Sequence, residues 1–567
     1  MNTVNLKINN IPVVAPEGAT ILEAAHLAGI RIPTLCYLKE INAIGACRIC
    51  VCEVKGARGL AAACVMPVGE GMEVFTNTPA LQRYRRTTLE LILSTHRTDC
   101  LSCTRSTDCE LQQLCREYGV DMNRFTKKDQ GYHTDASMPH LVRDNSKCIL
   151  CRRCVAVCQK NQYAGVIETC ERGYDTHIAC AFDMPLSETA CVACGQCTAV
   201  CPTAALRERD DTMEVFSALA DPDKITVVQV APAVRVAWAE EFGMSPRQGT
   251  TGRMVAALKR LGFDYVFDTN FSADLTIMEE GSEFIERFTH RNKYHWPMFT
   301  SCCPAWVRYL EFNAPKYLKH ISTCKSPMEM FAAVLKDQYA RKDEEDGRTT
   351  YHIAIMPCTA KKMEAARPEF VHNGRPDVDL VLTTRELVDM MRETGVQLDE
   401  LELESPDLPF GLGSGAAVIY GVTGGVAEAV VRHCLPDKSK NALRAVRVTD
   451  LRGDGSIRHV ELNVDGQELR IAVVNGLIHA KELIADIEAG KCFYHLIEVM
   501  TCQGGCVGGA GQPYGLSNVK KKRGEGLYAA DASAMFKRAE KNPIVTSLLR
   551  EYGEEKCHAL LHVHYGE

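Results

Sequence analysis

The sequence CILCRRCVAVC at residues 148–158 returns as CVACGQCTAVCP at residues 191–202. Both copies space their cysteines as C-x2-C-x2-C-x3-C, which is the spacing of ligands to paired 4Fe–4S clusters. In this pattern the fourth cysteine of each copy binds the cluster of the other copy. The repeat therefore predicts two clusters, one held by Cys148, Cys151, Cys154 and Cys201 and the other by Cys158, Cys191, Cys194 and Cys197.

The composition of the whole chain supports metal binding. The 567 residues include 28 cysteines, and the N-terminus MNTVNLKINN has neither the apolar core nor the twin arginine of a secretory signal. We therefore expect a cytoplasmic protein of about three to five domains, in which reduced cysteines bind metal rather than form disulfides. The net charge of −7 argues against a nucleic-acid surface, and the apolar tracts are too short and too interrupted to span a membrane.

Upstream of the repeat, the segment VNLKINNIPVVAP alternates like two short strands around an Asn-Asn turn, and Thr20 with Glu23 forms a capping box for a following helix. This order predicts a small β-grasp module. Four cysteines follow, with a central C-x2-C pair: Cys36, Cys47, Cys50 and Cys64. Four thiolates so spaced favour a 2Fe–2S cluster, and a zinc ion is the alternative.

A further ligand set stands between these two regions. The helical stretch LQRYRRTTLELILSTH leads into His96, Cys100, Cys103 and Cys109. Three thiolates leave a 4Fe–4S cluster one ligand short, so the imidazole of His96 is the natural fourth. A neutral imidazole makes the cluster less negative, and we expect a raised reduction potential. Zinc bound by three cysteines and one histidine remains the chemical alternative.

Downstream of the repeat, short apolar runs alternate with helical stretches, which predicts α/β structure. Open α/β sheets build their sites at the carboxyl ends of parallel strands. Four segments stand at such ends: APAVR (231–235), TSCCPAW (300–306), MPCTAKK (356–362) and EVMTCQGGCVGGAGQP (498–513). They supply one cysteine more than a 4Fe–4S cluster needs: Cys302, Cys303, Cys358, Cys502 and Cys506.

The three cysteine-bearing signatures, in this order and behind four cluster motifs, resemble the iron–iron (FeFe) hydrogenases in their long bacterial form. The resemblance spans essentially the whole chain and implies the reversible reduction of protons to hydrogen. It also implies a multidomain α+β and α/β fold. The expected parts are a β-grasp ferredoxin domain (1–78), a His/Cys cluster domain (79–118), a two-cluster bacterial ferredoxin domain (139–208) and an α/β catalytic domain (225–567).

The resemblance implies cofactors and the residues that hold them. Accessory clusters, one 2Fe–2S and three 4Fe–4S, would relay electrons to a catalytic 4Fe–4S cluster held by Cys303, Cys358, Cys502 and Cys506. Cys506 would also bridge to a diiron site with CO, cyanide and dithiolate ligands. Lys361 would donate a hydrogen bond to a cyanide. The other residues expected beside the cofactor are Met356, Met500, Pro232, Ala233 and Tyr420.

The fifth cysteine has a separate role. Adjacent side chains of an extended segment point in opposite directions, so Cys302 and Cys303 do not both face the cluster. A free thiol has a pKa of roughly 8.5 and can pass protons near neutral pH. In the family this position relays protons, and the matching path outward would run through Glu283 and Ser322 to Glu280 and Arg287. From the residues alone, a solvated helix face explains the two glutamates equally well.

Four positions depart from well-known members of the family: Ala233, Met328, Thr501 and Gln503. At the first two, relatives carry a hydroxyl and an amide, so we expect fewer hydrogen bonds to the cofactor.

The resemblance leaves open which partner supplies electrons. They would come from ferredoxin or from NAD(P)H-oxidising flavin and iron–sulfur subunits, because no Gly-rich dinucleotide fingerprint follows a strand in the relay region. Dedicated maturation proteins would insert the diiron site. A hydrogen-sensing relative and a non-catalytic iron–sulfur assembly protein are the alternatives, although Cys302 argues against the first, and Cys506 and Lys361 argue against the second.

Overall fold

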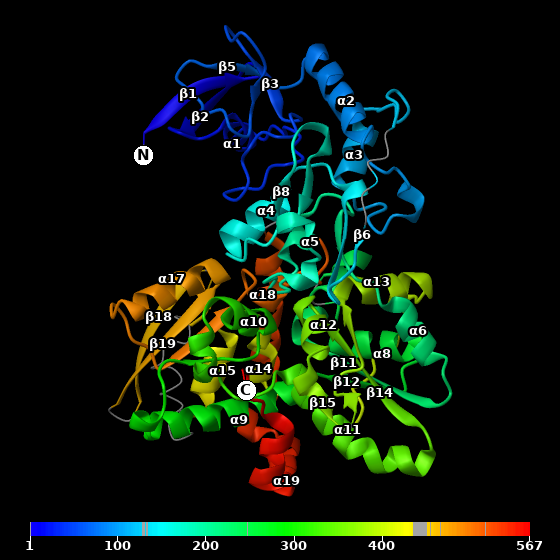
Figure 1. Ribbon diagram of the computed structural model, residues 1–567, viewed down its shortest axis with the longest axis vertical. Helices are drawn as coiled ribbons and strands as arrows, with labels where there is room; N and C mark the ends of the chain where they lie inside the picture. The colour runs from blue at the N-terminus through cyan, green and yellow to red at the C-terminus, as the bar shows by residue number, and fades with distance from the viewer. Residues whose placement is uncertain are drawn as a thin grey trace. The chain divides into compact units, whose positions relative to one another are not determined.

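The computed structural model describes residues 2–127, 131, 134–245, 248–372, 374–434, 451–453, 455–464, 467–515 and 518–566. The chain has mixed α/β structure and forms two compact units (Figure 1). The first unit comprises Met1–Thr189 and Gln196–Arg207, and the second comprises Ala190–Gly195 and Glu208–Glu567. Within the described residues, no helix combines the length and the apolar character needed to cross a bilayer.

The N-terminal part of the first unit is a five-stranded sheet with the order β2-β1-β5-β3-β4. Its strands are β1 (Thr3–Ile8), β2 (Ile11–Pro16), β3 (Val51–Val54), β4 (Ala61–Ala62) and β5 (Glu73–Phe75). Asn9 and Asn10 join β1 to β2 with positive φ angles of 50° and 68°, as a two-residue hairpin turn requires. Thr20 and Glu23 cap α1 (Ile21–Leu27), so the predicted order of strand, turn, strand and helix is confirmed.

The rest of the first unit consists of short elements around the cysteine motifs. They are α2 (Pro79–Leu93), α3 (Glu110–Glu117), β6 (Thr134–Asp135), β7 (Leu141–Asp144), α4 (Arg153–Ala156), β8 (Glu168–Cys170), β9 (His177–Ala179) and α5 (Gln196–Val200). The hydroxyl of Thr78 caps α2 by accepting a hydrogen bond from the backbone of Leu81. α2 buries Leu89 and Leu93 against the core, so the stretch that leads to His96 is an amphipathic helix as predicted.

The second unit contains a parallel sheet with the order β12-β11-β14-β17. Its strands are β11 (Lys224–Val230), β12 (Tyr265–Asp268), β14 (Thr349–Met356) and β17 (Leu380–Thr383). β11 is buried along almost its whole length, as expected of a parallel strand covered on both faces. The covering helices include α8 (Thr251–Leu261) and α13 (Thr384–Glu393), whose apolar sides join the strands in one core (Figure 1).

A second sheet of this unit has the order β13-β20-β19-β18. Its strands are β13 (Met298–Phe299), β18 (Ile457–Val464), β19 (Gln467–Asn475) and β20 (Leu496–Met500). Strands β13, β20 and β19 run parallel to one another, and β18 runs antiparallel to β19. Helices α15 (Gly425–Cys434) and α17 (Leu477–Glu488) pack against this sheet. The apolar runs that the sequence identifies as strands are therefore divided between two sheets.

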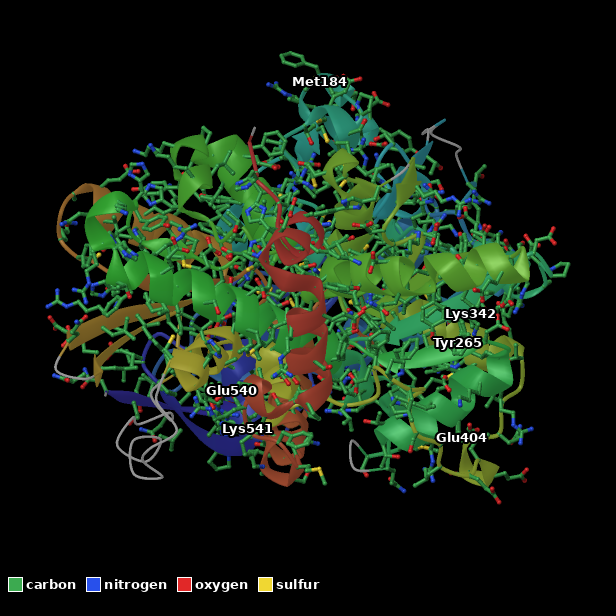
Figure 2. The ribbon with its side chains drawn as sticks, turned by 90° about the horizontal axis from the view of Figure 1, so that it is seen from below. Met184, Tyr265, Lys342, Glu404, Glu540 and Lys541 are labelled. Carbon is green, nitrogen blue, oxygen red and sulfur yellow. The ribbon has the colours of Figure 1, made fainter. Side chains whose placement is uncertain are left out.

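Three long helices pack beside the parallel sheet and share an aromatic core. They are α9 (Asn270–Thr289), α11 (Pro327–Asp346) and α19 (Pro543–Leu561). In Figure 2, α19 (red) lies against α9, and Tyr265 of β12 lies beside Lys342 of α11. The remaining helices are α6 (Thr212–Leu219), α7 (Pro232–Arg235), α10 (Pro304–Asn313), α12 (Ala360–Ala365), α14 (Gly415–Val418) and α18 (Asn518–Ser533).

Candidate active site

A cavity lies in the second unit where strands of both sheets end. β11 and β14 reach it from the parallel sheet, and β13 and β20 reach it from the second sheet. The loops that follow these four strands form much of its wall. The segments that the sequence places at strand ends therefore converge on one site, as open α/β sheets favour.

Every residue predicted to contact the catalytic cofactor lines this cavity. The cavity and its mouth contain about 800 Å³ of space free of protein atoms, part of which is open to solvent. The predicted residues in its wall are Cys302, Cys303, Cys358, Cys502, Cys506, Lys361, Met356, Met500, Pro232, Ala233 and Tyr420. Of the remaining departures from the family, Met328 and Thr501 line the cavity as well, whereas Gln503 does not.

Three thiols of this cavity, those of Cys358, Cys502 and Cys506, lie in an environment that opposes ionisation. Burial raises the pKa of Cys358 and of Cys506 to about 12, and it raises the pKa of Cys502 well above its ordinary value. Bound iron would supply the positive charge that holds such sulfurs as thiolates. The thiol of Cys303 donates a 3.2 Å hydrogen bond to the Thr501 hydroxyl. The donor set therefore fits an iron–sulfur cluster, and Thr501 adds a polar contact to one of its predicted ligands.

Two glycines allow the loop after β20 to approach the rest of the cavity wall. Gly505 has a φ of 86°, and a Cβ there would lie 2.6 Å from the backbone nitrogen of Thr423. A Cβ on Gly509 would lie 2.1 Å from the carbonyl oxygen of Pro357. A side chain at Gly509 would push this loop away from the one that carries Cys358. The close approach therefore requires glycine at both positions.

Cys302 lies on the apolar side of the cavity. It packs with Ala273, Tyr420 and Met500. Burial, and then the nearby carboxylate of Glu280, raise the pKa of its thiol well above the ordinary value. The raised pKa favours the protonated thiol, and the predicted proton-relay role of Cys302 stays a prediction.

A line of polar side chains leads away from Cys302 along α9. Glu280 is completely buried, and this burial raises its pKa to about 8. Both carboxyl oxygens of Glu280 lack a hydrogen-bond partner among the described residues, and the hydroxyl of Ser322 donates a 2.7 Å hydrogen bond to Oε2 of Glu283. Glu283 forms an ion pair with Arg287, one turn farther along the helix. The structure thus brings all the predicted relay residues together.

The order of the two glutamates differs from the predicted order. The family resemblance predicts Glu283 next to Cys302 and Glu280 toward the outside. In the structure Glu280 faces the buried thiol, whereas Glu283 pairs with Arg287. Arg287 and Ser322 line a second pocket, with a volume of about 450 Å³. The geometry therefore places Glu280 on the inner side of Ser322 and Glu283 on the outer side.

Lys361 faces the cavity but is already engaged by protein groups. Its ammonium lies 2.5 Å from Oε2 of Glu364 and 3.5 Å from the carbonyl oxygen of Cys302. Glu364 was not predicted from the sequence, although its position three residues after Lys361 in a helix favours an ion pair between the two side chains. Glu329, which is completely buried in the first turn of α11, was not predicted either. Burial and the neighbouring Glu364 raise the pKa of Glu329 well above its ordinary value.

In the first unit, one crossed set of cysteines lines a common cavity. Cys148, Cys151, Cys154 and Cys201 surround about 390 Å³ of space free of protein atoms. These are the four residues that the repeat assigns to one cluster. The other set, Cys158, Cys191, Cys194 and Cys197, is divided between the two units, and its ligation stays a prediction.

The two N-terminal ligand segments are tied to this crossed set by buried side chains. The amide of Asn42 donates hydrogen bonds to the carbonyl oxygens of Cys36, at 2.8 Å, and of Cys151, at 3.0 Å. Arg105, which lies between Cys103 and Cys109 in the sequence, donates a 3.0 Å hydrogen bond to the carbonyl oxygen of Cys201. Both N-terminal segments therefore adjoin the crossed set.

Of the predicted ligands of these two segments, Cys36, Cys50, Cys64 and His96 are buried. The sulfurs of Cys50 and Cys64 lie 3.4 Å apart. His96 is buried, its Nδ1 has no hydrogen-bond partner among the described residues, and burial lowers its pKa to about 4. A neutral imidazole with an unpaired nitrogen suits a metal ligand. Which metal these ligand sets hold, iron or zinc, stays a prediction.

Comparisons with protein families match most of the chain. Residues 224–510 match the family described as iron only hydrogenase large subunit, C-terminal domain, and residues 517–567 match the iron hydrogenase small subunit. Residues 1–79 match a 2Fe–2S iron–sulfur cluster binding domain. Residues 85–124 match the NADH-ubiquinone oxidoreductase-G iron–sulfur binding region, and residues 184–207 match a 4Fe–4S binding domain.

Two relatives match nearly the full length of the chain, and a solved structure matches 63% of it. It is 44% identical to the NADP-reducing hydrogenase subunit HndD of Solidesulfovibrio fructosivorans, over 100% of this chain and 99% of the relative. It is 35% identical to iron hydrogenase 1 of Clostridium pasteurianum, over 98% of this chain and 99% of the relative. The solved structure of [FeFe]-hydrogenase HydA1 from Chlamydomonas reinhardtii has a TM-score of 0.54 and 37% identity, covering 63% of this chain and 99% of that chain.

Proposed function

Because the chain belongs to the iron-only (FeFe) hydrogenase family and its close relatives are iron hydrogenases, we propose that it catalyses the reversible reduction of protons to hydrogen at a diiron site attached to a 4Fe–4S cluster. The observation that carries this proposal is the gathering of five cysteines and Lys361 on one cavity. Four sulfurs suffice for a cubane cluster, and the fifth is free for proton transfer.

The residues assigned to the cofactor follow from that cavity. Cys303, Cys358, Cys502 and Cys506 would hold the catalytic 4Fe–4S cluster, and the sulfur of Cys506 would also attach the diiron site. When bound, this composite cofactor supplies the metal centre at which two protons and two electrons become hydrogen. Lys361 would donate a charge-assisted hydrogen bond to a cyanide, while its pairing with Glu364 holds the ammonium in place. The remaining predicted residues pack around the diiron site: Met356, Met500, Pro232, Ala233 and Tyr420.

The proton path proposed from the geometry runs from Cys302 through Glu280 and Ser322 to Glu283 and Arg287. Glu280, with a pKa of about 8, can take up or release a proton near neutral pH. The hydroxyl of Ser322 can donate to one glutamate as it accepts from the other. A protonated carboxyl of Glu280 can thus renew the proton that the Cys302 thiol gives up.

The accessory clusters would form the electron relay. We propose one 2Fe–2S cluster in residues 1–78, a His-ligated 4Fe–4S cluster in 79–118 and two 4Fe–4S clusters in 139–208, ahead of the catalytic domain (225–567). The contacts of Asn42 and Arg105 support a branched relay, since each joins one N-terminal segment to the crossed set. Electrons from either N-terminal cluster would meet at the cluster of Cys148, Cys151, Cys154 and Cys201.

The partner of this relay is proposed from the full-length relative, which is named as a subunit of an NADP-reducing hydrogenase. We infer that NAD(P)H-oxidising subunits deliver electrons to the N-terminal clusters, with ferredoxin as the other donor. Maturation proteins would insert the diiron site. Gentle purification followed by mass identification of associated subunits distinguishes the two donors.

The infrared spectrum of the matured protein tests the proposed cofactor. CO and cyanide stretches are expected between the protein amide bands and the C–H region. Cys506→Ala should remove these bands and hydrogen evolution, whereas Cys492→Ser, which alters a cysteine outside the cavity, should retain both. Absence of the bands from the matured wild-type protein would leave only an iron–sulfur relay. Persistence of the bands in Cys506→Ala would refute the assigned bridge.

A further inference from the structure

Three histidines near the C-terminus lie together beside the outer end of the proton path. His558 of α19 stacks on His562, with ring centroids 5.1 Å apart and ring planes 9° apart. The centroid of His558 also lies 5.8 Å from that of His564. His558 and His564 are exposed to solvent. Since α19 lies against α9 (Figure 2), the group is held next to the helix that carries the path.

Hydrogen bonds and a shared pocket connect these histidines to the path. Nδ1 of His562 lies 2.8 Å from the hydroxyl of Thr323, and the backbone N–H of Thr323 donates to Glu283 at 3.1 Å. On its other side, Nε2 of His562 lies 3.1 Å from Oε2 of Glu279. His564 lines the same 450 Å³ pocket as Ser322 and Arg287. His564 therefore shares a pocket with Ser322, Thr323 and Arg287, and His562 reaches Glu283 through Thr323.

We propose that His558, His562 and His564 collect protons for this path, an inference that rests on the proposed hydrogenase function. In the direction of hydrogen formation, a protonated imidazole gives its N–H proton to a water molecule of the pocket. That water passes a proton to the carboxylate of Glu283, where an O–H bond forms. The neutral imidazole then takes a proton from a buffer acid outside. One proton enters for each proton delivered, no electrons move, and hydrogen oxidation uses the same steps in reverse.

The surroundings explain why a proton-collecting group is useful here. The cationic side chains of the pocket wall are Arg287, which pairs with Glu283, Lys316, which lies 2.8 Å from Oε1 of Glu488, and Lys319. Hydronium is scarce at neutral pH, so few free protons reach this pocket. Imidazole exchanges its proton near neutral pH and can hold one close to the pocket. The ionisable groups that face the histidines or the pocket are Glu279, Glu283, Arg287, Lys316, Lys319, Cys557 and Tyr565.

The test compares hydrogen evolution by the matured full chain at several buffer concentrations. In a variant with His558→Gln, His562→Gln and His564→Gln, turnover in dilute buffer should fall by roughly tenfold, and added imidazole should restore it. His479→Gln is the matched control, because His479 is likewise paired with a glutamate, at 3.0 Å, on a different helix. It should evolve hydrogen like the wild type at every buffer concentration.

The outcomes separate this proposal from the hydrogenase assignment. Equal turnover of the triple variant and the wild type in dilute buffer would overturn the proton-collecting role, as would a loss that imidazole does not restore. His564→Gln alone removes an exposed ring of the pocket wall and should give a smaller, imidazole-restored loss, so the proposal stays testable if the triple variant folds poorly. A matured wild type that lacks both hydrogen evolution and CO bands would instead refute the proposed function.

Discussion

Replacing Glu280 by glutamine should have opposite effects on stability and on activity. The pKa of Glu280 in the folded chain is about 8, against an ordinary value of 4.5, chiefly because the carboxyl is buried. Between these two values the folded chain holds a proton that the unfolded chain has released. The free energy of unfolding therefore decreases as the pH rises from 4.5 toward 8, and it levels off above 8.

The size of this effect follows from the gap between the two pKa values. Each pKa unit corresponds to 1.36 kcal/mol, so Glu280 alone accounts for a decrease of about 5 kcal/mol across the range. Glu280→Gln carries no titrating proton and should lack this decrease, which makes the variant the more stable protein near pH 8. Hydrogen evolution should fall strongly, because an amide cannot release a proton to the Cys302 thiol.

The assay is anaerobic denaturation of the full chain at several pH values between 5 and 8, followed by hydrogen evolution. Glu286→Gln is the control, since Glu286 is an exposed residue of the same helix. It should keep the pH dependence of the wild type. An identical pH dependence of unfolding in Glu280→Gln and the wild type would show that Glu280 is not protonated in the fold. Wild-type hydrogen evolution by Glu280→Gln would remove this residue from the proton path.

Three other predictions concern single residues. Cys302→Ser should keep the iron content and the diiron infrared bands but lose most hydrogen evolution, and near wild-type turnover would refute the relay role of this thiol. His96→Cys should lower the reduction potential of one accessory cluster, because a thiolate replaces a neutral ligand; an unchanged redox titration would contradict that ligation. Lys520 is half-buried, and desolvation lowers the pKa of its ammonium although the nearby Cys502 acts in the opposite direction. Lys520→Met should therefore lower the reduction potential of the catalytic cluster. Lys521→Met, which changes an exposed neighbouring lysine, should leave that potential unchanged. Equal potentials in the two variants would show that the Lys520 charge does not act on the cluster.

The gathering of the cysteines could be predicted because it depends on local patterns. Each apolar run that precedes a cysteine motif forms a strand, and parallel strands bring their carboxyl ends to one edge. The division of these strands between two sheets could not be predicted. β18 and β19 form a hairpin that completes the second sheet, and its strands were not identified from their sequences. Strand partners far apart in the chain leave no local signal.

The order of the two glutamates in the proton path could not be predicted from the sequence. Glu280 and Glu283 are three residues apart, so helical periodicity places them on one face without saying which end of that face is buried. Their order depends on how α9 packs against the segment that carries Ser322, which is a tertiary property. Glu329 was missed for a similar reason, because an acidic residue in the first turn of a helix is common at the surface. Only the tertiary structure reveals that Glu329 is buried and that Glu364 acts on it.

The walls of the catalytic cavity belong to two sheets, and this has a consequence for assembly. Cys358 follows a strand of the parallel sheet, whereas Cys303 and Cys502 follow strands of the other. A cluster bound by all three would cross-link the two sheets, and its binding free energy would add to the free energy of unfolding of the whole unit. With the catalytic cluster loaded, the two sheets should therefore unfold in one cooperative transition rather than separately. The shape of the heat-capacity curve during thermal unfolding would then report how much of the protein carries the cluster.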